Sequence, residues 1–251
     1  MSDATTATPS AEAVAFMKQS FRHPDMDALL ADDPKLAQLY SEVRAGIVRN
    51  VKTQPGGFKA TSGVVLPYYL NLSTNFMDPQ VAPKIVALAS LMLLKLHPTI
   101  AASPDERVAV VGMEVAGGML VSQLACTLNP ELNGKFDFCY MRKTKKTTGT
   151  AQQLEGLKLF TDRTASSPPL KAIWVDDVNS TGSSLTSGIE TLLADYNIDV
   201  AAALYVCDRS QDRMDLPAEK MFLAKPRFTE QRTRVVALMD LKEIDPLVPR
   251  E

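Results

Sequence analysis

The fold is decided by the segment at residues 172–185, which reads AIWVDDVNSTGSSL. An apolar run, typical of a strand buried on both faces of a parallel sheet, leads into the adjacent carboxylates Asp176 and Asp177. Small hydroxyl residues and a glycine follow at 180–184, and a helical pattern covers 182–196. The first turn of a helix has unpaired N–H groups and a partial positive charge, so this loop can hold a phosphate, while the carboxylates can accept hydrogen bonds from neighbouring hydroxyl groups. The segment therefore predicts a site for a phosphorylated sugar, although a plain strand, acidic turn and serine-rich helix cap would share this pattern.

Apolar runs alternate with helical patterns along the rest of the chain, which predicts an α/β fold with a central, mostly parallel, twisted sheet flanked by helices. Ligands of such sheets bind at the carboxyl ends of the strands. We expect a disordered lead over 1–11 and a single domain over 12–251, in which about 12–75 forms a small N-terminal hood and base-binding segment and 76–251 forms the core. The predicted strands lie at 107–112, 136–141, 171–175, 200–207 and 235–241, with a β-prone stretch at 64–72 and a turn at 54–57, and the predicted helices lie at 12–22, 34–51, 78–96, 117–128 and 182–196.

The composition of the 251 residues is that of an ordinary globular protein, with 45% hydrophobic and 22% charged residues. The net charge of −2 argues against a dedicated nucleic-acid binder, which would carry a strongly basic face. The cysteines Cys126, Cys139 and Cys207 form no CxxC pair, so we expect neither a zinc site nor a disulfide framework, and a cytoplasmic location fits best. The best apolar run, 85–96, is interrupted and too short to cross a membrane, and the N-terminus lacks the basic start and apolar core of a signal peptide.

Residues 175–184, VDDVNSTGSS, resemble the signature of the phosphoribosyltransferases that use phosphoribosyl pyrophosphate (PRPP). The resemblance implies the type I phosphoribosyltransferase fold. In that family the two acids, here Asp176 and Asp177, hold the 2- and 3-hydroxyls of the ribose and belong to the catalytic machinery. The loop that follows holds the 5-phosphate, and here its residues are Ser180, Thr181, Gly182, Ser183 and Ser184.

A basic segment at 138–149, FCYMRKTKKTTG, resembles the strand and mobile loop of orotate phosphoribosyltransferase, and 153–156 resembles the return from that loop. Two unit charges about 4 Å apart attract by roughly 4 kcal/mol at an effective dielectric of 20, so several cations can stabilise a pyrophosphate leaving group. Taken alone, a solvated basic loop would have the same composition. Thr148 stands where that family has a histidine. The residues that match the catalytic, PRPP-binding positions are Arg142, Lys143 and Lys146.

The segment at 110–118, VVGMEVAGG, resembles the strand end that binds pyrophosphate in the same family. Its candidate PRPP-binding residues are Glu114 and Ala116, and some members carry lysine where Ala116 stands. The resemblance also implies a non-proline cis peptide in this loop. A glycine pair before a helix is a weak signal by itself, because it also serves close packing.

Two further segments resemble the parts of orotate phosphoribosyltransferase that bind the base. The segment at 61–71, TSGVVLPYYLN, would place Tyr68 and Tyr69 beside the pyrimidine, with Tyr69 packed on it. Thr61 stands where the family has a lysine before Ser-Gly, and Lys59, two residues earlier, is the candidate replacement for that lysine. The segment at 205–211, YVCDRSQ, ends a predicted strand in Asp-Arg, and the arginine fork suits the carboxylate of orotate. The orotate-binding candidates are Arg209, Ser180, Tyr68, Tyr69 and Lys59.

The resemblance implies an enzyme that transfers ribose 5-phosphate from PRPP to orotate, giving orotidine 5′-monophosphate and pyrophosphate in de novo pyrimidine biosynthesis. It implies Mg²⁺ bound mainly through PRPP, with no dedicated metal ligands in the protein, and a homodimer whose basic loop is shared across subunits. No nucleic-acid or membrane partner is expected. Two alternatives stay open: a phosphoribosyltransferase for another nucleobase, and a non-catalytic PRPP-binding regulatory protein on the same fold.

Overall fold

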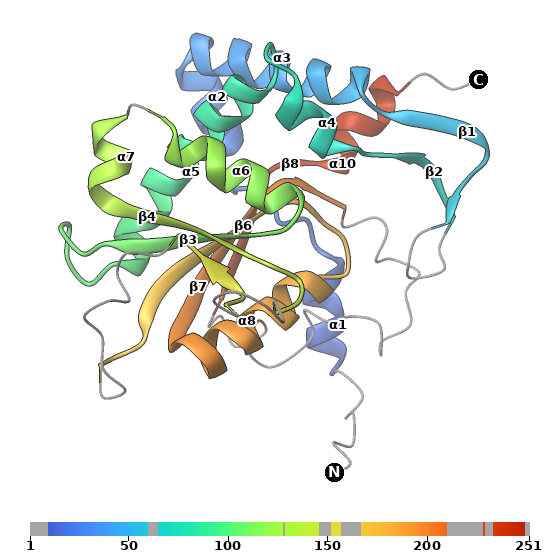
Figure 1. The fold of residues 1–251 in the computed structure, drawn as a ribbon. Coiled ribbons are helices and arrows are strands. Elements are labelled where there is room, and N and C mark those ends of the chain that lie inside the picture. The colour runs from blue at the N-terminus through green and yellow to red at the C-terminus, as the bar shows by residue number, and fades with distance from the viewer. Residues whose placement is uncertain are drawn as a thin grey trace, which may run out of the picture.

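The computed structural model describes residues 10–59, 65–127, 129–145, 152–156, 167–209, 228 and 233–248. A six-stranded sheet with strand order β5-β4-β3-β6-β7-β8 forms the centre of the molecule (Figure 1). Neighbouring strands are parallel except β4 and β5, which run antiparallel. The predicted α/β fold with a mostly parallel sheet is therefore confirmed. The strands are β3 (Val108–Met113), β4 (Phe136–Met141), β5 (Leu154–Glu155), β6 (Leu170–Asn179), β7 (Ile198–Asp208) and β8 (Arg234–Asp240).

Helices cover both faces of this sheet (Figure 1). On one face α3, α5 and α6 bury apolar side chains against one set of strand residues, and on the other face α1 and α8 bury theirs against the alternate set. Val110 and Val175 belong to the first core, whereas Val111 and Trp174 belong to the second. Successive strand residues point to opposite faces, so a sheet covered on both sides needs continuous apolar runs, which is the pattern in the sequence.

The predicted helices are present with shifted ends. Asp33 caps α3 by accepting hydrogen bonds from the N–H groups of Lys35 and Leu36, and Pro34 is the first helical residue. The predicted helix at 12–22 ends early, because Arg22 forms a β-bridge with Ala237 of β8 instead. The helices are α1 (Ala11–Lys18), α2 (Met26–Asp32), α3 (Pro34–Arg49), α4 (Leu72–Met77), α5 (Ala82–Ile100), α6 (Ala116–Ala125), α7 (Pro130–Lys135), α8 (Ser183–Tyr196) and α10 (Leu241–Ile244), with a 3₁₀ turn at Asp245–Leu247.

A separate antiparallel hairpin consists of β1 (Lys52–Lys59) and β2 (Val65–Tyr69). The prediction of a turn at 54–57 is wrong, because these residues lie inside β1. The pairing register shifts between Thr53 and Phe58, and Gly56 and Gly57 take the positive φ angles of 79° and 72° that such an irregularity requires. The β-prone stretch is confirmed as β2. The division into a hood over about 12–75 and a core over 76–251 stays a prediction.

Within the described part of the chain, α5 is the one helix long and apolar enough to cross a membrane, judged by length and composition. Its Ile85, Ala89 and Leu93 have no exposed surface, and they belong to the core that the helix shares with β7, β8 and α3. A central position in the protein core accounts for the apolar composition of this helix.

Candidate active site at the carboxyl ends of the strands

Three of the predicted segments meet where β3, β6 and β7 end. The loop after β3 carries Glu114, the end of β6 carries Asp176 and Asp177, and the residue after β7 is Arg209. Because β6 pairs with both β3 and β7, the three segments lie side by side at one edge of the sheet. This edge is where parallel α/β sheets bind their ligands.

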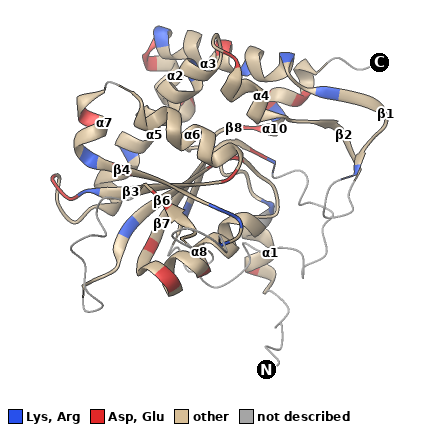
Figure 2. Ribbon diagram, viewed as in Figure 1, with Lys and Arg blue, Asp and Glu red and all other residues tan. Residues whose placement is uncertain are grey.

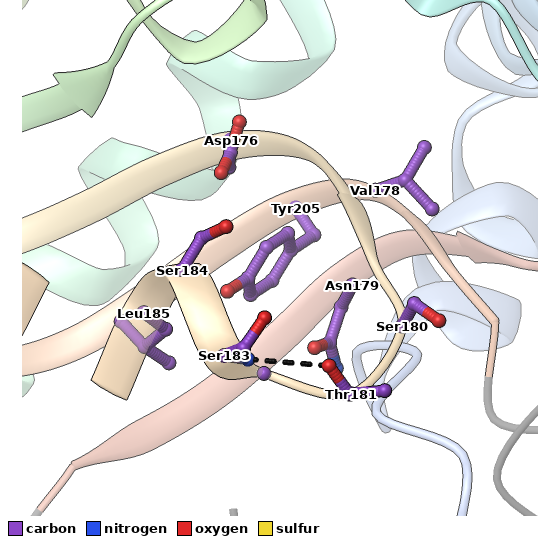
Figure 3. A pocket seen from close by; sticks show the side chains of 10 residues that line it. Asp176, Val178, Asn179, Ser180, Thr181, Ser183, Ser184, Leu185 and Tyr205 are labelled. Carbon is purple, nitrogen blue, oxygen red and sulfur yellow. Dashed lines mark hydrogen bonds between the residues drawn. The ribbon is translucent and has the colours of Figure 1, made fainter. Parts of the chain in front are cut away.

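The phosphate loop, residues 180–184, follows β6 directly, and its last two residues, Ser183 and Ser184, begin α8. Gly182 precedes the first helical residue with φ of 77°, a left-handed conformation that favours glycine. The loop and its flanks line a cavity of about 80 Å³ at the N-terminus of the helix (Figure 3). Tyr205 of β7 also lines this cavity, beside Asp176, which is its register partner on β6. A helix N-terminus bordered by hydroxyl side chains is suited to a phosphate.

The acid pair lies inside the strand and not beyond it. The predicted strand at 171–175 continues to Asn179, because Asp176 and Val178 keep their pairing with β7. Burial raises the pKa of Asp176 well above its ordinary value, and the neighbouring charge of Asp177 raises it further. Burial also raises the pKa of Asp177, against the opposing effect of the hydrogen bond from the N–H of Val178. Hydroxyl donors or a cation beside the two side chains would therefore stabilise their ionised form.

The loop after β3 is joined to both neighbouring segments. The Glu114–Val115 peptide is cis, as the resemblance implies. The Oε1 of Glu114 accepts a hydrogen bond from the N–H of Lys143 over 2.7 Å. Gly117 packs so closely on β6 that a Cβ there would lie 2.7 Å from the carbonyl oxygen of Val175 and 3.1 Å from Oδ1 of Asp176. The candidate Ala116 is the first residue of α6.

The basic segment is held at its base by its own neighbours. Arg142 forms an ion pair with Glu155 over 3.2 Å, and its guanidinium lies 5.2 Å from the centre of the Tyr140 ring. Lys145 pairs with Asp195 near the end of α8 over 2.6 Å, so this cation is turned away from the phosphate loop at the other end of that helix. Basic and acidic residues are spread over the whole ribbon (Figure 2). Lys143 has an exposed side chain. Thr61, Lys146 and Thr148 lie outside the described residues.

The two tyrosines of β2 face opposite ways. The side chain of Tyr68 is buried, whereas Tyr69 is 46% exposed and its ring centre lies 5.8 Å from that of Phe58. Burial raises the pKa of the Tyr68 phenol, the negative charge of Asp245 raises it further, and the positive charge of Arg209 lowers it. Tyr68 therefore lies close to the buried Arg209. Tyr69 and Lys59 occupy exposed positions of the hairpin.

Three residues of this edge were not assigned from the sequence: Tyr205, Asn179 and Asp208. Tyr205 lines the phosphate cavity, and Asn179 donates a hydrogen bond to Asp208. Each of the three residues stands in a segment that the sequence analysis selected. Their proximity follows from the parallel register of β6 and β7, which pairs Asn179 with Asp208 and Asp176 with Tyr205. The sequence of a single strand does not specify that register.

Comparison with known proteins identifies the family of the chain. Residues 81–233, more than half of the chain, match the family described as phosphoribosyl transferase domain. The orotate phosphoribosyltransferase of Staphylothermus marinus is 29% identical over 170 residues, which cover 68% of this chain and 71% of that protein. The one from Sulfolobus acidocaldarius is 29% identical over 156 residues, which cover 62% and 66%.

Solved structures show the same fold. The orotate phosphoribosyltransferase of Mycobacterium tuberculosis, solved with Fe(III) dicitrate, superposes with a TM-score of 0.58 at 16% identity, covering 82% of this chain and 98% of that one. The adenine phosphoribosyl transferase of Trypanosoma brucei superposes with a TM-score of 0.51 at 14% identity, covering 83% and 84%. With the phosphate loop, the acid pair and the match over 81–233 all in place, the chain belongs to the phosphoribosyltransferase family.

Proposed function

We propose that this enzyme transfers the ribose 5-phosphate group from PRPP to orotate, giving orotidine 5′-monophosphate and pyrophosphate in pyrimidine biosynthesis. The names of the matched relatives support orotate as the base. The observation that carries the proposal is the position of Arg209, whose N–H donates to the carbonyl oxygen of Asn179 over 2.8 Å. An arginine is thereby placed next to the phosphate loop, where a base bearing a carboxylate would need it.

In this proposal the ribose of PRPP lies along the end of β6. Asp176 and Asp177 accept hydrogen bonds from the 2- and 3-hydroxyls, and the residues at 180–184 hold the 5-phosphate with hydroxyl and N–H donors. Hydroxyl donors favour the ionised carboxylates and so offset the effect of burial on their pKa values. The ionised pair then faces the positive charge that grows on the ribose as the pyrophosphate leaves.

The leaving group and the base are held by different segments. N1 of orotate forms the new bond to C1 of the ribose while the bond from C1 to the pyrophosphate oxygen breaks. Lys143, with Lys146 and Arg142, stabilises the negative charge that develops on the pyrophosphate. Arg209 and Tyr68 bind the orotate, with Ser180 beside it, while the exposed Tyr69 and Lys59 need a movement of the hairpin to reach the base.

The carboxylates of the site suit Mg²⁺ as a cofactor. Mg²⁺ prefers oxygen ligands and is commonly held by one or two carboxylates together with substrate phosphates. The described residues hold no group of three or more His, Cys, Asp or Glu side chains that could hold a metal ion by themselves. Asp176 and Asp177 would supply at most two of the oxygen ligands, so most of the other ligands would come from PRPP. The ion would then neutralise negative charge on the pyrophosphate.

We also propose a homodimer that shares the basic loop, and a cytoplasmic location. Met77 and Val115 are 71% and 69% exposed, and they line a surface cavity of about 490 Å³ together with Glu114 and Tyr140. An apolar patch beside the site is suited to a second subunit. All three cysteines are free thiols, which fits a reducing compartment.

The test is an assay of the purified protein with PRPP and Mg²⁺, offering orotate, uracil and adenine in parallel and following base consumption and pyrophosphate release. Turnover with orotate alone supports the proposal. Turnover with adenine or uracil but not with orotate would show that the enzyme is a phosphoribosyltransferase for another nucleobase. PRPP binding without turnover of any base would make the chain a binding protein.

A further inference from the structure

A buried hydrogen bond joins the ends of the two strands that lead to the phosphate loop and to Arg209. Asn179 ends β6 and Asp208 ends β7, and the two are register partners. Nδ2 of Asn179 donates to Oδ1 of Asp208 over 2.8 Å, and the two residues are only 1% and 0% exposed. The strand ends are therefore linked by side chains as well as by the bond from the Arg209 N–H to the Asn179 carbonyl.

The second oxygen of Asp208 is also held. Its Oδ2 accepts a hydrogen bond from the N–H of Phe21 over 3.2 Å. Phe21 is itself fixed to β8, because its carbonyl oxygen accepts from the N–H of Ala237 over 2.8 Å. The carboxylate is thus oriented from one side by the N-terminal segment and from the other by Asn179. A buried carboxylate that loses such a donor is left under-satisfied at a substantial cost.

We propose that Asn179 and Asp208 are a positioning pair that sets the spacing between the phosphate loop and Arg209. The inference rests on the proposed function and deepens it. Asn179 immediately precedes Ser180, and Asp208 immediately precedes Arg209, so a shift of either strand end moves one subsite relative to the other. The reaction needs the phosphate end of the ribose and the carboxylate of the base held at once while N1 meets C1, and a displacement of about 1 Å can cost on the order of 100-fold in rate.

The pair can be tested by exchanging its members. Asn179→Asp brings two carboxylates together without a donor between them. Asp208→Asn replaces one of the two accepting oxygens by an NH₂ group, so an N–H donor of either Asn179 or Phe21 loses its acceptor. The exchange variant, Asn179→Asp with Asp208→Asn, restores a donor and an acceptor in reversed positions: the new amide nitrogen at 208 donates to the carboxylate at 179, and the one amide oxygen accepts from the N–H of Phe21.

The measurements are kcat, the KM values for orotate and PRPP, and the melting temperature of each variant. We expect Asn179→Asp to lower kcat about 100-fold and to raise the KM for PRPP, because Asn179 lines the cavity assigned to the 5-phosphate. Asp208→Asn should lower kcat with little change in that KM, and the exchange variant should recover kcat about tenfold or more. If Asn179→Asp does not fold, Asp208→Asn serves as the single variant, and adding Asn179→Asp to it should raise kcat.

Thr233→Val is the matched control. It removes another buried hydrogen bond of β7, in which Oγ1 of Thr233 donates to the carbonyl oxygen of Val200 over 2.9 Å near the start of the strand. We expect it to lower the melting temperature and leave kcat unchanged. If wild type turns over orotate but the exchange fails to recover kcat, or if the single variants behave like Thr233→Val, the pair is only structural and the inference is overturned. A wild type without orotate turnover would overturn the proposed function itself.

Discussion

The N–H of Lys143 donates to Oε1 of Glu114 over 2.7 Å, and this bond joins the start of the basic segment to the loop after β3. The N–H of Glu114 in turn donates to the carbonyl oxygen of Met141, the last residue of β4, over 2.8 Å. The two segments expected to bind pyrophosphate are therefore one structural unit, and Glu114 sets the point from which the basic chain leaves the sheet.

Removing the Glu114 carboxylate should detach the start of the basic segment from the loop after β3. A hydrogen bond to a charged group contributes about 1.5–3 kcal/mol, so Glu114→Ala is expected to lower kcat by roughly tenfold to 100-fold. Glu114→Gln keeps an acceptor oxygen at the same place and should retain most of the activity. Steady-state kinetics of the two variants decide the point: equal losses would mean that Glu114 contributes through its charge and not by holding Lys143.

The two described lysines of the basic segment should differ in their effect on the reaction. Lys143→Ala is expected to lower kcat by at least tenfold while PRPP affinity changes little, because the cation acts on charge that develops only in the transition state. Lys145→Ala removes an exposed ion pair with Asp195, and solvent screening leaves such pairs with little effect on stability. Its kinetics should stay close to those of the wild type. Similar losses in both variants would show that the segment acts only through its net charge.

The acid pair should make stability depend on pH. Burial raises the pKa values of Asp176 and Asp177 in the folded state above the ordinary value of 3.8, so the folded protein binds more protons than the unfolded chain above that pH. The free energy of unfolding contributed by the pair is therefore fully present below about pH 4 and is lost as the pH rises through the raised folded-state values.

The double variant Asp176→Asn with Asp177→Asn should lack this loss. Relative to wild type it should melt at a higher temperature at neutral pH, with the difference shrinking toward pH 4, while its affinity for PRPP falls. Thermal melts across this pH range and PRPP titrations measure the two effects. If the double variant binds PRPP as tightly as wild type, the assignment of the ribose hydroxyls to this acid pair is wrong.

Much of this architecture could be predicted from the sequence, because strands buried on both faces leave continuous apolar runs. The run that ends in Asp176 and Asp177 is the central strand β6, and the cavity at the start of α8 lies where the sequence predicts a site for a phosphorylated sugar. The short helices α2, α4 and α7 were not predicted, since tertiary packing contributes more to segments of this length than their own helical pattern. The turn expected at 54–57 is a stretch of irregular pairing inside β1, and this difference depends on how β1 pairs with β2.

The assignment of base-binding residues stays a prediction. Strand alternation places Tyr68 and Tyr69 on opposite faces, so they cannot both lie against one base without a change in the hairpin. The structure puts Tyr68 in the interior near Arg209 and leaves Tyr69 exposed. Asn179 and Asp208 were missed because their pairing follows from the register of two strands 29 residues apart in the sequence.

The most direct test of the account compares orotate with uracil, which lacks the carboxylate, in wild type, Arg209→Ala and Arg209→Lys. A site built to hydrogen-bond a substrate group can reject the analogue that lacks it by on the order of 10⁴-fold or more, so kcat/KM of wild type should favour orotate strongly. Arg209→Ala should collapse that preference while sparing PRPP binding, and Arg209→Lys should restore it only in part, because lysine lacks the parallel donors. A preference for orotate that survives Arg209→Ala, or a wild type that does not discriminate between the two bases, would contradict the account.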